Sequence, residues 1–153
     1  MYFVDRGKME EILAYMETCI RTFDGNRDWQ EFKDQLALER LAHVLIESVI
    51  DVGNQMIDGF IMRDPGSYAD IIDILCDEKV ITQTDGGSLK KLIEERKELV
   101  RSYTSVDHSG LSGLIEVCLP ALKAFPGAVR RYLEEELGPV SAFKHQEEQE
   151  NRE

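Results

Sequence analysis

The stretch "LAHVLIESVIDVG", residues 41–53, decides the fold class of this chain. Its apolar side chains recur at spacings of three and four and cover more than one face of a helix. A helix that is apolar most of the way round must be buried on several sides. The surrounding pattern predicts one long helix from about residue 29 to about residue 62. Because a chain this small offers few elements to cover so many faces, we expect a homodimer in which a second copy covers one of them.

Helical patterns also flank this long segment, and no stretch shows the alternation of a β-strand. Ser67, followed three positions later by Asp70, resembles a capping box that opens one of the helices. The expected helices cover residues 5–23, 29–62, 67–78, a segment from about 89, and 110–137. We therefore predict an all-α bundle of about five helices in one domain, residues 1–137.

Three other features of the chain give expectations of their own. The segment "TQTDGGS", residues 82–88, has the composition of a loop. Pro120 and Pro126 are expected to break or bend the last helix, since proline lacks the backbone N–H and clashes with the preceding turn. The polar residues 138–153 are expected to form a disordered tail.

Composition limits the class of protein. Of 153 residues, 42% are hydrophobic and 31% are charged, which is typical of a soluble globular domain. No continuous apolar run approaches the roughly 18 to 20 residues of a membrane span, and the charged start does not resemble a secretory signal. We therefore expect a cytoplasmic protein without membrane contact. A net charge of −12 opposes extended binding to DNA but allows a small local basic site for RNA.

The three cysteines, Cys19, Cys76 and Cys118, are isolated, and none forms a C-x-x-C pair or has a histidine nearby in the sequence. Each falls on an apolar helical face, so we expect buried, inert thiols. This pattern favours neither a metal site nor a cofactor.

The segment "ERKELVRSYTSVD", residues 95–107, is the candidate site. Arg96 and Tyr103 are seven residues apart and would share one face of a continuous helix, whereas Arg101 would lie about 140° round from Arg96. Guanidinium binds phosphate bidentately without losing its charge, which also makes it a poor general base. The segment thus predicts a phosphate-binding site without an obvious proton shuttle.

A simpler interpretation of the same arginines is structural. Arg96 and Arg101 would then only form ion pairs with Glu94, Glu95 or Glu98 on a solvated helix face. Spacing alone does not decide between a phosphate site and this surface pairing.

Three stretches make the chain resemble the HepT-type branch of the HEPN superfamily, small bacterial and archaeal all-α proteins that include ribonuclease toxins. They are "ALERLAHVLIESVIDVGNQM" (37–56), "DPGSYADIIDILCDEKVI" (64–81) and "LIEERKELVRSYTSVD" (92–107), within a match that runs from about residue 1 to 137.

The family signature is an arginine, four residues, a histidine, one residue and a tyrosine, followed four positions later by an acid. Arg96, Tyr103 and Asp107 match the arginine, the tyrosine and the acid, and Val100 matches a valine common before the histidine. Arg101 stands at the histidine position, and Lys97 stands where asparagine is common.

The resemblance implies a metal-independent endoribonuclease that works as a homodimer, with the motif residues of both subunits at the dimer cleft. Arg96 would hold the scissile phosphate and stabilise its developing charge. The family histidine would move protons, a role that typically contributes about 10²–10⁴-fold in rate and that Arg101 leaves vacant. Many such toxins pair with a nucleotidyltransferase antitoxin that attaches AMP to the motif tyrosine, which here would be Tyr103.

The chain contains three histidines outside the motif that could replace the family histidine in proton transfer. His108 is the histidine nearest to the motif in the sequence. We expect it to be an exposed loop residue and a secondary candidate for a catalytic role. His43 is expected to be a satisfied core or interface residue of the long helix, and His145 falls in the tail.

Three functions stay open from the sequence. The first is a HepT-type ribonuclease that uses two arginines. The second is a HEPN-fold protein that binds RNA or a nucleotide, or a nucleotidyltransferase, without cleaving RNA. The third is a helical dimer with a purely structural role.

Overall fold

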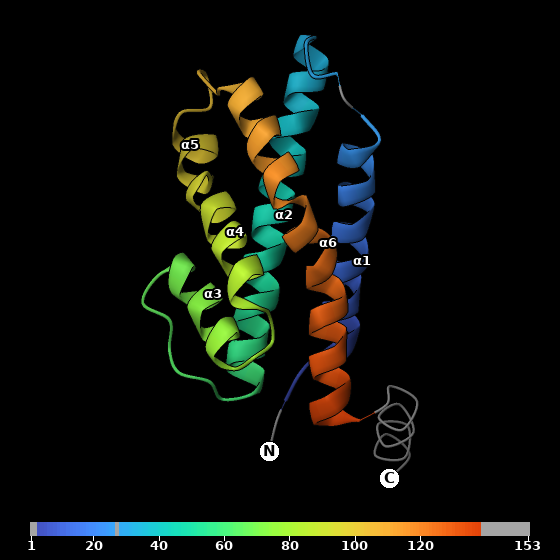
Figure 1. The fold of residues 1–153 in the computed structure, drawn as a ribbon, viewed down its shortest axis with the longest axis vertical. Helices are drawn as coiled ribbons and strands as arrows, with labels where there is room; N and C mark the ends of the chain where they lie inside the picture. Colours follow the sequence, from blue (N-terminus) through green and yellow to red (C-terminus); the bar gives the residue numbers. More distant parts are fainter. Residues whose placement is uncertain (1–2, 27, 139–153) are drawn as a thin grey trace.

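The computed structural model describes residues 3–26 and 28–138, which form six helices and no strand. The helices are α1 (Arg6–Asp24), α2 (Phe32–Gly59), α3 (Tyr68–Asp77), α4 (Gln83–Glu94), α5 (Arg96–Arg101) and α6 (His108–Leu137). The short α5 continues α4 beyond a break at Glu95, so the two together correspond to one of the five expected helices. The predicted all-α bundle is confirmed (Figure 1). The tail expected from residue 138 lies, apart from Gly138, outside the described residues.

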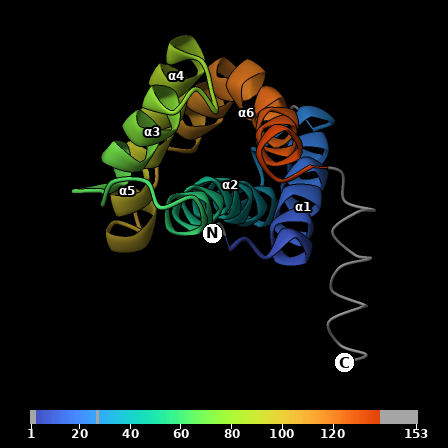
Figure 2. The ribbon, with the colours of Figure 1, turned by 90° about the horizontal axis from the view of Figure 1, so that it is seen from below.

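Helix α2 lies at the centre of the packing. It contacts α1, α3, α5 and α6, and most of its apolar side chains are fully buried. Figure 2, seen along the bundle, shows α2 between α1 on one side and α3 with α5 on the other. The chain therefore covers most of α2 itself, and the reason given above for a second copy does not hold. The homodimer remains a prediction, and a second copy would have to bind to a surface other than the apolar faces of α2.

Capping side chains fix where four of the helices begin. Asp5, Ser67, Thr82 and Asp107 each accept a hydrogen bond from the backbone N–H three residues later. The cap at Thr82 makes residues 83–88 the first turns of α4, so the loop expected at 82–88 is wrong. The cap at Asp107 makes His108 the first residue of α6, two residues before the expected start.

The two glycines that suggested a loop have a different role in α4. A Cβ atom on Gly86 would overlap the sulfur of Cys76, because α3 and α4 approach closely there. Gly86 is therefore buried at a helix contact, whereas Gly87 next to it has open space. Glycine allows this close approach without a turn.

Helix α6 is continuous for 30 residues and contains both Pro120 and Pro126. It changes direction about halfway along its length, which agrees with a bend rather than a break (Figure 1). Among the described residues, α6 is also long and apolar enough in mean hydropathy to cross a membrane. Most of its apolar side chains belong to the core, where α6 contacts α1, α2 and α4.

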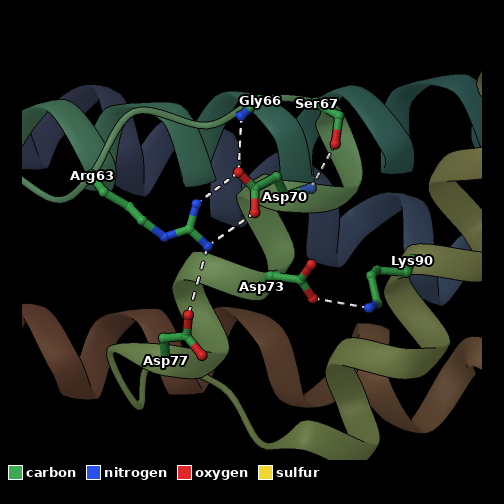
Figure 3. Close-up of polar contacts among 7 residues, drawn as sticks. All are labelled: Arg63, Gly66, Ser67, Asp70, Asp73, Asp77 and Lys90. Atoms are coloured by element: carbon green, nitrogen blue, oxygen red, sulfur yellow. Dashed lines mark hydrogen bonds and ion pairs between the residues drawn. The ribbon is translucent and has the colours of Figure 1, made fainter.

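Ion pairs fasten α3 to its neighbours (Figure 3). Arg63 donates two hydrogen bonds to Asp70, at 2.7 and 2.9 Å, and lies 3.6 Å from Asp77. The Asp70 carboxylate also accepts from the N–H of Gly66, so it does not complete the capping box with Ser67. These bonds lower the pKa of Asp70 to about 2 and hold the 60–67 linker against α3.

The cysteines are buried, as predicted. Cys19, Cys76 and Cys118 are at most 8% exposed, and burial raises the pKa of each thiol.

Candidate functional site

Arg96 is held by two other helices at the start of α5. Its Nε donates a hydrogen bond of 2.6 Å to Oε1 of Glu47 in α2, and its guanidinium lies 5.0 Å from the ring centroid of Tyr68 at the start of α3. The bond to Glu47 raises the pKa of Arg96, so the side chain keeps its charge. The contact with Glu47 is made through Nε, and the two Nη groups make no hydrogen bond to another described residue.

The simpler interpretation of Arg96 is wrong in its choice of partner. The carboxylate that holds Arg96 is 49 residues away in the sequence, not one of the neighbouring glutamates. An arginine fixed at Nε by a distant carboxylate and covered by an aromatic ring presents its Nη groups in a defined direction.

Arg101 and Tyr103 lie at the end of this segment. Helix α5 ends at Arg101, and Tyr103 lies in the turn that follows, so the prediction that Arg96 and Tyr103 share a helix face is wrong. The physical reason is that the helix stops before the seven-residue spacing is complete. Arg101 is exposed and Tyr103 is 69% exposed, and neither makes a hydrogen bond or ion pair with another described residue.

Asp107 and His108 both have structural partners. The carboxylate of Asp107 accepts from the backbone of Gly110 as the cap of α6. His108 Nε2 lies 2.8 Å from Oε2 of Glu39, with the two side chains only 21% and 20% exposed. The expectation of an exposed loop histidine is therefore wrong, because His108 begins a helix that packs beside α2.

Glu39, His43 and Glu47 form a stripe along one face of α2, which we call the α2 polar stripe. Their four-residue spacing places them one above another on the helix. His108 binds one end of the stripe and Arg96 the other. His43 lies between them, with its Nε2 3.6 Å from Oε1 of Glu47, and its side chain is 34% exposed.

Sequence reasoning missed Glu39 and Glu47 as the partners of His108 and Arg96. The apolar character of residues 41–53 dominated the interpretation, although the pattern E-x-x-x-H-x-x-x-E was there to be found. Among residues 3–26 and 28–138, no group of three or more His, Cys, Asp or Glu side chains is placed to hold a metal ion. Chemically, a guanidinium group can bind phosphate and an imidazole can exchange protons near neutral pH.

Sequence comparison places this chain in a family. The ribonuclease HepT-like family matches residues 9–129. A protein of Bacillus subtilis (strain 168) named "Putative RNase YutE" is 56% identical over 144 residues, which span 94% of this chain and all of that protein. The chain belongs to the ribonuclease HepT-like family.

Solved structures agree with this membership. The structure of YutE from Bacillus subtilis, described as a cytosolic protein of unknown function, aligns with a TM-score of 0.90 over 93% of this chain and 99% of that chain. A toxin–antitoxin crystal structure with AMP-PNP aligns with a TM-score of 0.72 at 20% identity, over 80% of this chain and 97% of the other.

A third comparison is with a tri-AMPylated Shewanella oneidensis HEPN toxin in complex with an MNT antitoxin. It aligns with a TM-score of 0.70 at 20% identity, over 80% of this chain and 96% of the other. At this identity the likeness shows a common fold, and that fold is the HEPN bundle of HepT-like proteins.

Proposed function

We propose that this HepT-like protein is a metal-independent endoribonuclease of the cytoplasm that works as a homodimer, with Arg96 and Arg101 binding the scissile phosphate. The observation that carries the proposal is the anchoring of Arg96 by Glu47 and Tyr68. Two Nη groups in a fixed orientation suit the bidentate binding of phosphate oxygens and the stabilisation of charge that develops during cleavage.

Arg101 adds a second positive charge at the far end of the same short helix. Its exposed side chain is free to turn toward RNA or toward a second copy of the chain. Because the protein carries a net charge of −12, RNA contact depends on this local site rather than on general attraction to phosphate.

The proposal extends to Tyr103 as an acceptor of AMP from a nucleotidyltransferase partner. In that reaction the phenol oxygen attacks the α-phosphorus of ATP, pyrophosphate leaves, and the phenol proton is lost. The 69% exposure of Tyr103 and its position two residues after Arg101 support the role. The HEPN toxin of Shewanella oneidensis, which is AMPylated and bound to its MNT antitoxin, supplies the analogy.

A second candidate function is RNA or nucleotide binding without cleavage. The observation that favours it is Arg101 at the position where the family histidine stands, since arginine does not exchange protons near neutral pH.

One cleavage assay separates the two functions. A labelled single-stranded RNA is incubated in EDTA with the wild-type protein and with Arg96→Ala, Arg101→His and Lys97→Ala. The last variant removes an equal charge from the exposed residue next to Arg96. We expect wild-type cleavage that Arg96→Ala abolishes and Lys97→Ala preserves. Cleavage by Arg101→His alone would instead exclude cleavage by the natural protein and favour the binding function.

A further inference from the structure

The polar residues on α2 suggest where the proton-transfer group lies. We propose that His43 is the general base of RNA cleavage, taking the role that Arg101 cannot perform. This inference rests on the ribonuclease function proposed above, and it concerns a residue outside the family motif.

The geometry links His43 to Arg96 through the carboxylate of Glu47. Oε1 of Glu47 accepts from Nε of Arg96 at 2.6 Å, and the same oxygen lies 3.6 Å from Nε2 of His43. One carboxylate oxygen therefore lies between the imidazole and the guanidinium. In this proposal, a phosphate bound by the Nη groups of Arg96 brings its ribose to His43.

His43 is also accessible to a substrate. Its side chain is 34% exposed, and its Nε2 is too far from Glu47 for a made hydrogen bond. Glu47 further lines a groove of about 710 Å³ between α1 and α2, where the charges of Lys8 and Arg40 are offset by the carboxylates of Glu11, Glu47 and Asp51.

His108 is less suited to the same role. Its Nε2 is occupied by Glu39 at 2.8 Å, and its side chain is only 21% exposed. Its contact with Glu39 joins the start of α6 to α2, so its role is structural. Of the two described histidines, His43 is thus the one with the more exposed side chain and the longer contact to a carboxylate.

The proposed step balances without a cofactor. Nδ1 of His43 takes the proton of a ribose 2′-hydroxyl, and the 2′-oxygen forms a bond to phosphorus. The bond from phosphorus to the 5′-oxygen breaks, and that oxygen takes a proton from water. The products are a 2′,3′-cyclic phosphate and a 5′-hydroxyl, and His43 returns its proton to solvent. Glu47 stabilises the imidazolium from the Nε2 side while it holds Arg96.

The test compares His43→Ala, His43→Gln and His108→Gln with the wild type, on labelled single-stranded RNA in EDTA. Cleavage rate, RNA affinity and melting temperature are measured for each protein. We expect both His43 variants to lose cleavage by about 10²–10⁴-fold while they keep their RNA affinity. Added imidazole should restore part of the activity of His43→Ala, an effect that loss of a structural contact would not give. His108→Gln should melt earlier yet still cleave.

Two results would overturn the inference and are distinguishable from each other. Wild-type rates in folded His43→Ala and His43→Gln would remove His43 from catalysis and leave the ribonuclease function intact. Absence of cleavage by the wild type would remove the proposed function, and the role of His43 with it.

Discussion

Oε1 of Glu47 accepts a 2.6 Å hydrogen bond from Nε of Arg96, and this bond joins the middle of α2 to the first residue of α5. Both side chains are about one-third exposed, so water screens the pair and its contribution to stability is modest. Its greater effect is on direction, because it fixes where the guanidinium points.

Replacing Glu47 with glutamine should weaken RNA binding more than it weakens the fold. The amide can still accept a hydrogen bond but lacks the charge, so we expect a loss of about 1 kcal/mol or less in the free energy of unfolding. RNA affinity, measured by fluorescence anisotropy, should fall because Arg96 becomes less ordered. Glu98→Gln, an exposed change on α5, is the control. Equal affinities of the two variants would contradict the ordering role of Glu47.

Acid should weaken the fold through Asp70. The pKa of Asp70 is about 2 in the folded protein against an ordinary 3.8, so its contribution is complete above the ordinary value and is lost as the pH falls toward 2. The urea midpoint of the wild type should therefore drop between about pH 5 and pH 2. Asp70→Asn should show a smaller drop. Asp58→Asn, an exposed change on α2, should behave as the wild type, and identical slopes for all three would refute the assignment.

Gly53 should not tolerate a side chain. A Cβ atom there would overlap a methyl group of Ile71 at the α2–α3 contact, so Gly53→Ala should cost about 1–3 kcal/mol in the free energy of unfolding. Gly87→Ala, which meets open space within α4, should instead gain about 0.5–1 kcal/mol. Urea denaturation measures both. A stabilising Gly53→Ala would mean that α3 moves away easily.

Light scattering should give a mass of twice the 17.5 kDa chain. Since α2 is covered within the chain, we expect the exposed end of α5 to meet the second copy, and Val100 is 47% exposed there. Val100→Asp should therefore shift the protein toward monomer, because a charge would be buried in the interface. Val117→Asp is the matched control on α6, where Val117 is 66% exposed. A monomeric wild type would exclude the dimer, and dissociation by the control alone would move the interface to α6.

If a nucleotidyltransferase partner is supplied with ATP, mass spectrometry should find AMP on Tyr103. Tyr15 and Tyr68 are also more than 40% exposed and serve as internal controls for unselective labelling. Tyr103→Phe should remain unmodified. Modification of Tyr15 or Tyr68 in its place would break the analogy with the AMPylated toxin.

The sequence predicted the helices best where local signals agreed. The apolar spacing and the cap at Ser67 placed α1, α2 and α3 within about three residues of their observed ends. The start of α4 was missed because Gly86 and Gly87 carry the composition of a turn. Only the closeness of Cys76 on α3 explains Gly86 within a helix, and that contact is tertiary.

The candidate site was less predictable because its partners are distant in sequence. The motif pointed to Arg96, but nothing local indicated that Glu47 and Tyr68 would hold it. The face shared by Arg96 and Tyr103 depended on a helix that ends at Arg101. Helical spacing predicts which side chains share a face only for residues that lie within the helix.

The reactivity of the three buried thiols can report local unfolding of the bundle. Cys19, Cys76 and Cys118 lie on α1, α3 and α6, so a thiol reagent can react with each only when that helix leaves the core. The order in which they become labelled under mild denaturant would map which side of the bundle detaches first, without any added probe.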